Sequence, residues 1–377
     1  MAEGGAVMAL HVGVGVPVPV GREVLDALES VTVTAGTDGP GGFQLRFDVA
    51  TDSPVTTLFL ATSGASPLPL VRVVVAVRLA GASEVLVDGV VVRHEFAKGD
   101  GPGRMTLTVT GEDLGRMMDF LDASGVQYPA MPDFARVTLI LAKYAGLGVI
   151  PKVIPSVFVD VPLPTERIPA QIGTDLAYIR ALADRAGYVF YLEPGPGVGT
   201  SVAYWGPEAK LGAPQKALSV DMDHGSNVED LTFSYEGDRA TLPIVLVQNR
   251  ETRATIPLPV PPITPLSPPL TAVPAIPRRV DPIRETAKYD PVQGVAVGLA
   301  KAARTAQVAA AEGTLEVARY GAVLRPRKLV GLRGAGLAFD GHWYVESVTT
   351  TLARGRLTQD FTLSRNGLVS TVDKVPA

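Results

Sequence analysis

The sequence predicts a β-rich α+β protein in which an α/β unit is inserted between two antiparallel β regions. Three patterns support this fold class. Apolar and polar residues alternate in the first hundred positions, a helical period follows after Gly111, and alternation returns near the C-terminus. The 377 residues are enough for two or three domains with a substantial core.

The first β region is expected at residues 1–112. Alternating apolar residues indicate strands from Phe43 to Val49, from Val71 to Leu79 and from Met105 to Val109. The dipeptide Asp88-Gly89 lies between two apolar runs and is typical of a two-residue hairpin turn, because both positions tolerate a positive φ. We therefore expect the chain to reverse there.

Residues 113–212 are expected to form the inserted α/β unit. Leu114 to Leu121 and Phe134 to Tyr144 each place their apolar residues on one helical face. A third helix is expected between Thr174, a typical N-cap, and Gly187, a typical helix-ending residue. An aromatic strand, Tyr188 to Leu192, follows it.

The second β region is expected to be discontinuous, at 213–255 and 320–369, with residues 370–377 as a tail. Strand patterns occur at Leu231 to Tyr235, at Ile244 to Val247, and from Trp343 to Arg365.

Residues 256–319, between these two parts, have a different composition. Ten of the 27 residues from Ile256 to Pro282 are proline, which favours an extended strap or linker lying on the surface or against a neighbour. A docking site for a proline-recognition domain is the less favoured alternative. The alanine-rich stretch from Val292 to Glu312 predicts a helix.

Composition and charge exclude several classes of protein. There are no cysteines, which removes disulfides, thiol nucleophiles and cysteine-ligated metal, and the formal net charge of -4 argues against nucleic-acid binding. The sequence shows no signal peptide and no apolar run long enough for a transmembrane helix. We expect synthesis and assembly in the cytoplasm, without direct membrane insertion.

Motifs that carry chemistry are almost absent. Asp221-Met222-Asp223-His224 is the one tight cluster of possible metal ligands, and a solvated turn is favoured there over a calcium or magnesium site. The sequence contains neither a phosphate-binding loop nor a nucleophile elbow. No catalytic, cofactor-binding or metal-binding residue is therefore assigned, and we expect a protein that is not an enzyme and needs no cofactor.

Three stretches together resemble the baseplate hub proteins of contractile phage tails and injection systems, the late control gene D family, whose fold also forms the hub portion of type VI secretion VgrG spikes. Each stretch is individually a weak signal, and the specificity lies in their order and spacing over most of the chain. The stretches are MTLTVTGEDLGRMMD (Met105 to Asp119), AQIGTDLAYIRALADRAGYVFYLEPG (Ala170 to Gly195) and Leu324 to Leu368, which contains FDGHWYVESV and FTLSRNG.

The resemblance implies two tail-tube-like β-barrel domains with the α/β domain between them. It also implies a structural role, as a homotrimer that joins a six-fold inner tube to a three-fold spike within a phage-tail-like particle. The implied partners are the inner tube protein, a separate spike protein and other baseplate components. A particle-associated cell-wall hydrolase and a β-rich module that binds carbohydrate or protein are the alternatives.

Overall fold

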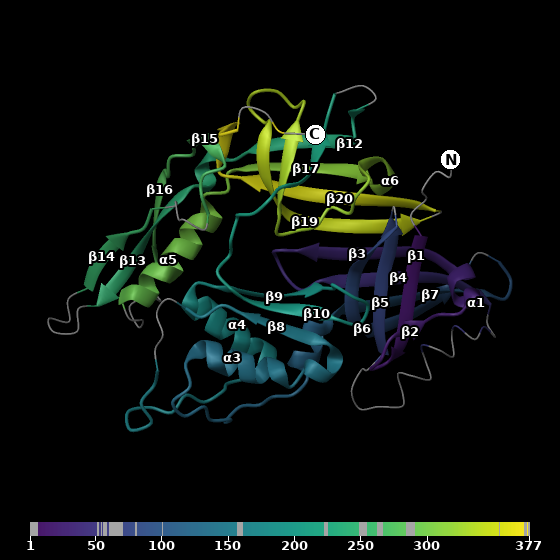
Figure 1. The fold of residues 1–377 in the computed structure, drawn as a ribbon, viewed down its shortest axis with the longest axis horizontal. Coiled ribbons are helices and arrows are strands. Elements are labelled where there is room, and N and C mark those ends of the chain that lie inside the picture. Colours follow the sequence, from purple (N-terminus) through teal and green to yellow (C-terminus); the bar gives the residue numbers. More distant parts are fainter. Residues whose placement is uncertain are drawn as a thin grey trace.

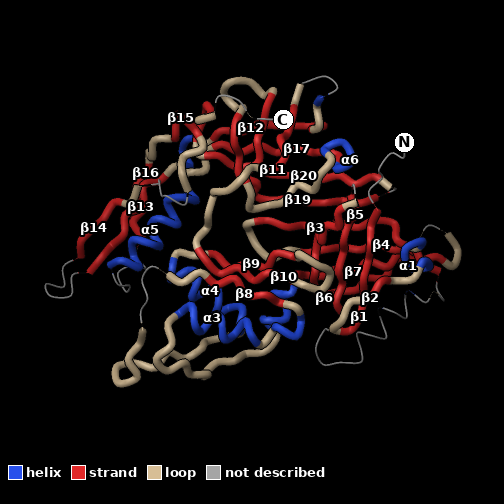
Figure 2. Tube along the Cα trace, in the orientation of Figure 1, coloured by secondary structure: helices blue, strands red, loops and turns tan. Residues whose placement is uncertain are grey.

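The computed structural model describes residues 7–50, 53, 55, 59, 71–79, 81–99, 101–156, 161–221, 225–248, 255–261, 267–283, 291–353, 355–372 and 375. Most of the regular secondary structure in the described chain is antiparallel β-sheet, as the sequence predicts (Figure 2).

One 13-stranded sheet extends through both β regions (Figure 1). Its strands are β1 (Val7–Val14), β2 (Val18–Pro19), β3 (Leu28–Gly36), β4 (Gly42–Ala50), β5 (Val71–Leu79), β6 (Ala82–Lys98), β7 (Arg104–Asp113), β11 (Gln215–Ser219), β12 (Val228–Tyr235), β17 (Ala309–Glu316), β18 (Leu329–Arg333), β19 (Gly341–Ala353) and β20 (Arg356–Arg365). Their order is β12-β17-β20-β19-β3-β4-β7-β6-β5-β1-β2, and β18 joins β11 to β19. Two short helices, α1 (Arg22–Asp26) and α6 (Val317–Tyr320), lie beside this sheet.

The two halves of this sheet are joined edge to edge by β3 and β19. Their antiparallel register runs from Gly36 opposite Ser347 to Ser30 opposite Ala353. Each half has an apolar core, but the core of the second half also includes Val77 and Leu79 of β5, and Leu86 packs against both cores. The β-barrel form of each half and the domain boundaries remain predictions.

The Asp88-Gly89 hairpin prediction is wrong, because β6 continues through both residues and pairs with β5 on one side and β7 on the other. The glycine is needed for packing. A Cβ at position 89 would overlap the carbonyl oxygen of Glu112 on β7. Asp88 is buried and paired with Arg72 of β5, so neither residue has the exposed position of a turn.

The α/β unit contains the helices α3 (Asp133–Ala142) and α4 (Asp175–Ala186) and a sheet of β8 (Val149–Val153), β10 (Ser201–Gly206) and β9 (Val189–Pro194), in that order. The predicted caps of α4 are confirmed, since the Thr174 hydroxyl accepts from the amide of Ala177 and Gly187 has a φ of 69°. The helix predicted from Leu114 is a 3-10 helix, η1 (Leu114–Asp119); a second, η2 (Ala145–Leu147), follows α3.

The proline-rich segment pairs with its own chain as extended strands. β14 (Thr255–Pro259) and β16 (Arg279–Ile283) flank β13 (Thr241–Gln248) in a small sheet against which α5 (Pro291–Thr305) packs. β15 (Thr271–Pro274) pairs with β21 (Gly367–Ser370). β13, which contains the strand predicted at Ile244 to Val247, therefore lies outside the large sheet.

The alanine-rich helix is shorter than predicted. It ends at Thr305, and residues 309–316 form β17 between β12 and β20. The small residues are needed in the sheet, because Ala309 and Ala311 are buried and a Cβ at Gly313 would crowd Asp230 and Phe361. Close packing in the sheet overrides the helix propensity of alanine here.

Candidate functional site

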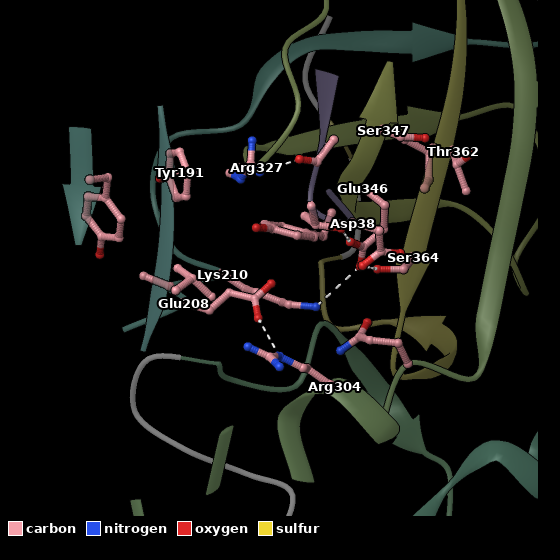
Figure 3. Close-up of a pocket in the computed structure, with 18 of the residues that line it drawn as sticks. Asp38, Tyr191, Glu208, Lys210, Arg304, Arg327, Glu346, Ser347, Thr362 and Ser364 are labelled. Atoms are coloured by element: carbon pink, nitrogen blue, oxygen red, sulfur yellow. Dashed lines mark hydrogen bonds and ion pairs between the residues drawn. The ribbon is translucent and has the colours of Figure 1, made fainter. Parts of the chain in front are cut away.

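A polar cavity of about 810 Å³ lies where the large sheet meets the α/β unit and the end of α5 (Figure 3). Its walls come from the end of β3, from β9 and β10, from residues 207–210, and from β17, β19 and β20. These segments are far apart in the sequence, so only the folded chain creates this space.

Buried Lys210 forms an ion pair with half-buried Glu346 at the cavity wall (Figure 3). Lys210 is 3% exposed, its Nζ lies 3.6 Å from Glu346 Oε1, and it lies 4.4 Å from the centre of the Tyr344 ring. Glu346 also accepts hydrogen bonds from the hydroxyls of Thr37, at 2.7 Å, and Ser364. The Glu346 carboxylate is therefore held by two hydroxyl donors and one cation, which come from three different segments.

Arg327 forms a second cationic group at the cavity. Its guanidinium lies 4.0 Å from the centre of the Tyr191 ring and donates to the carbonyl oxygen of Gly36. Tyr191 in turn stacks on Tyr204, with ring centres 5.0 Å apart. Arg327 has a φ of 60°, a conformation that costs about 1–3 kcal/mol in a residue other than glycine and that tends to occur at functional sites.

The lining has more positive than negative charge. Lys152, Arg239 and Arg304 add to the two cations above, against three carboxylates, those of Asp38, Glu208 and Glu346. Arg304 and Glu208 form an ion pair at 3.6 Å. The lining therefore has a formal charge of +2, five minus three, in a chain whose formal net charge is -4.

The chemical groups of the lining determine which ligands the cavity could hold. No histidine is among its described lining residues, and within the described chain no group of three histidine or carboxylate side chains is placed to hold a metal ion. Burial raises the pKa of both Tyr191 and Tyr344, which therefore remain neutral at physiological pH. The lining offers cations, hydroxyl groups and aromatic faces.

The metal-ligand candidate from the sequence falls mostly outside the described residues. Asp221 is described, with a φ of 48°, while Asp223 and His224 lie outside the described part. The residues that line the cavity form no recognisable sequence motif. The positive φ of Arg327 is an unusual feature among them, but it can be seen only in the folded chain.

None of the helices in the described part of the chain is long and apolar enough to cross a membrane.

Comparisons with known proteins identify the fold. No family model and no curated protein matches this chain. A tail protein from Neisseria meningitidis is similar over 97% of this chain and 98% of its own, with a TM-score of 0.64 and 14% identity. The 43 kDa tail protein of prophage MuSo2 from Shewanella oneidensis is similar over 95% and 98%, with a TM-score of 0.61 and 14% identity.

Type VI secretion proteins share the fold as well. A component of the Escherichia coli type VI secretion system is similar over 93% of this chain and 76% of its own, with a TM-score of 0.51 and 12% identity. A chain of the Francisella PdpA–VgrG complex is similar over 99% of this chain and 60% of its own, with a TM-score of 0.54 and 7% identity. The chain therefore has the fold of phage tail proteins and of type VI secretion components.

Proposed function

We propose that this chain is a structural component of a phage tail or tail-like injection particle, and that it forms its baseplate hub. In this role three copies join a six-fold inner tube to a three-fold spike, which is a separate protein. The fold shared with tail and type VI secretion proteins supports the structural role. The three sequence stretches that resemble hub proteins support the more specific assignment.

The pairing of β3 with β19 is the observation that carries the adaptor model. It joins two β-rich halves of one chain edge to edge, so that one chain offers two β units side by side. Three such chains present six units to a six-fold tube while keeping a three-fold axis for the spike. A closed ring of identical copies is the usual way in which protein assemblies satisfy repeated interfaces.

The two ends of the large sheet support association in a ring. Within the described residues β12 pairs only with β17, and β2 covers β1 only at His11 and Val12. Unpaired strand edges favour pairing with another chain. If neighbouring copies pair edge to edge, as β3 and β19 do within one chain, both free edges of the sheet gain hydrogen-bond partners.

Light scattering and electron cryo-microscopy of the purified protein, alone and with its tube and spike, test this proposal. We expect a three-fold ring with six β units. The variant Thr232→Lys/Ser234→Lys on the exposed side chains of β12 should shift the ring toward monomers, while Gln44→Lys, on an exposed position inside the sheet, should not. A monomer or a dimer in the assembled particle contradicts the proposal.

The cell-wall hydrolase alternative has a separate test. It requires purified protein to clear peptidoglycan, and one carboxylate substitution to abolish clearing without changing the melting temperature. The hub proposal expects no clearing.

A further inference from the structure

The free edge of β9 faces the polar cavity. β9 is the outer strand of the β8-β10-β9 sheet, and its residues Val189, Phe190 and Tyr191 line the cavity. Among the described residues no strand pairs with its outer edge. β9 is half-buried along its length. A strand edge without a pairing partner can bind an extended peptide, because the backbone of the peptide continues the hydrogen bonding of the sheet.

Lys210 has unused hydrogen-bonding capacity. An ammonium group has three N–H donors, and burial without acceptors is costly. Among the described residues Lys210 has its ion pair with Glu346 at 3.6 Å, which exceeds hydrogen-bond length, and the Tyr344 ring, but no hydrogen bond. This buried cation therefore lacks an acceptor on the cavity side.

Arg327 also has N–H donors without a protein acceptor among the described residues. A guanidinium has five N–H donors in a planar fork that matches a carboxylate, and among the described residues only the carbonyl of Gly36 accepts from it. Its contact with the Tyr191 ring holds it beside β9 (Figure 3). A carboxylate on a peptide along β9 therefore meets a cation that is already in place.

The charges favour an anionic group on the ligand. The lining carries a formal charge of +2, which attracts anions in general. The unpaired edge of β9 selects a peptide, and the unmodified side chains of a peptide supply anions as carboxylates. The cavity volume of about 810 Å³ also falls in the range of sites that enclose drug-sized ligands, and exceeds what a small free acid needs.

We propose that the cavity binds an extended acidic peptide of a partner protein, which adds to the free edge of β9 and places a carboxylate against Lys210 and Arg327. This inference goes beyond the hub function and does not depend on the number of copies in the ring. The bound state extends the β8-β10-β9 sheet by one strand and gives both cations an acceptor.

Fluorescence anisotropy with labelled hexapeptides tests the proposal on the full chain. The probes are Val-Asp-Val-Asp-Val-Glu, its neutral counterpart Val-Asn-Val-Asn-Val-Gln, and free citrate as a competitor. We expect binding of the acidic peptide, at least about tenfold weaker binding of the neutral one, and weak competition by citrate. Backbone amides of β9 should gain protection from hydrogen exchange when the acidic peptide is bound.

Two variants with opposite expected effects separate recognition from folding. Lys210→Met keeps the length of the side chain and should weaken the acidic peptide about tenfold, whereas Glu346→Gln removes a competing carboxylate and should strengthen it. Lys328→Met removes an exposed lysine adjacent to Arg327 and is the matched control, expected to leave the affinity unchanged.

Several outcomes overturn the proposal. The proposal fails if the folded protein does not bind the acidic peptide, or if it binds both peptides equally. It also fails if citrate competes as strongly as the unlabelled acidic peptide. It fails as well if Lys210→Met and Glu346→Gln both weaken binding of the acidic peptide. The trimeric ring is tested by particle mass and symmetry, whereas peptide binding is tested by anisotropy. The hub proposal and the peptide proposal can therefore fail independently.

Discussion

Arg72 and Asp88 form a buried bidentate ion pair, in which Arg72 Nε and Nη2 donate to the two carboxylate oxygens at 2.7 and 2.6 Å. The pair connects β5 with β6 and extends to other elements. Arg72 also donates to the carbonyl of Gly15 at 3.3 Å, and the hydroxyl of Ser201 on β10 lies 3.4 Å from Asp88. It therefore lies where the large sheet contacts the α/β unit.

Removal of one partner of this pair should strongly destabilise the protein. Arg72→Leu leaves a buried carboxylate without its cation, and we expect a loss of about 3–5 kcal/mol in the free energy of unfolding. The double variant Arg72→Leu/Asp88→Leu should recover much of that loss. Urea denaturation measures both.

The exposed pair of Arg46 and Glu29 is the matched control, since its side chains are 53% and 49% exposed. Arg46→Leu should cost no more than about 1 kcal/mol. Equal effects of Arg72→Leu and Arg46→Leu would contradict the special role of the buried pair.

Gly89→Ala should be destabilising by about 2 kcal/mol or more, because the new methyl group overlaps the backbone of Glu112. Gly146→Ala in η2 is the control, since nothing lies within 4 Å of a Cβ at that exposed position. It should not destabilise the protein. Thermal melting of both variants checks this, and a neutral Gly89→Ala would contradict the close approach of Glu112 to position 89.

Acidification should destabilise the fold through His94 and His342. Burial lowers the pKa of both imidazoles below the ordinary value of 6.5. The folded chain then binds fewer protons than the unfolded chain, so this contribution to stability is complete above pH 6.5 and is lost as the pH falls toward the folded-state pKa values.

Urea denaturation at about pH 8 and about pH 5.5 measures this effect. His94→Gln and His342→Gln should each reduce the loss of stability between the two conditions, and the double variant should reduce it further. An unchanged difference in all three variants would assign the acid sensitivity to other groups.

Chelation of divalent metal should leave the melting temperature unchanged. Within the described residues no group of three potential ligands lies together, and the sequence offers only the cluster Asp221-Met222-Asp223-His224. Melting before and after EDTA treatment, with elemental analysis of the purified protein, checks this. A stoichiometric metal ion, or a fall of more than a few degrees, would show that a metal contributes to folding.

Local patterns predicted single elements well where the local energy is decisive. The α4 helix has a capping Thr174, an apolar stripe and a terminating Gly187, and these act within a few residues of one another. The strand pattern from Trp343 to Arg365 likewise corresponds to β19 and β20, which pair with each other so that Ala353 faces Arg356. Resemblance of three spaced stretches also indicated the class of fold that the comparisons show.

Local patterns failed where contacts with distant residues decide the structure. Asp88-Gly89 has the composition of a turn, but a buried Arg72 and the close approach of Glu112 keep it in a strand. Residues 309–312 favour a helix by composition, but small side chains are what a strand between β12 and β20 requires.

The sequence by itself determined the β-rich α+β class, the α/β unit between two β regions and the absence of recognisable catalytic motifs, because each follows from periodicity or composition along a short window. The tertiary structure alone decided the β3–β19 junction, the pairing of the proline-rich strands and the cavity. Lys210 and Glu346 are 136 residues apart (346 minus 210), yet they form an ion pair in the cavity wall. No local pattern encodes such a contact, because its energy exists only after the sheet and the α/β unit have packed together.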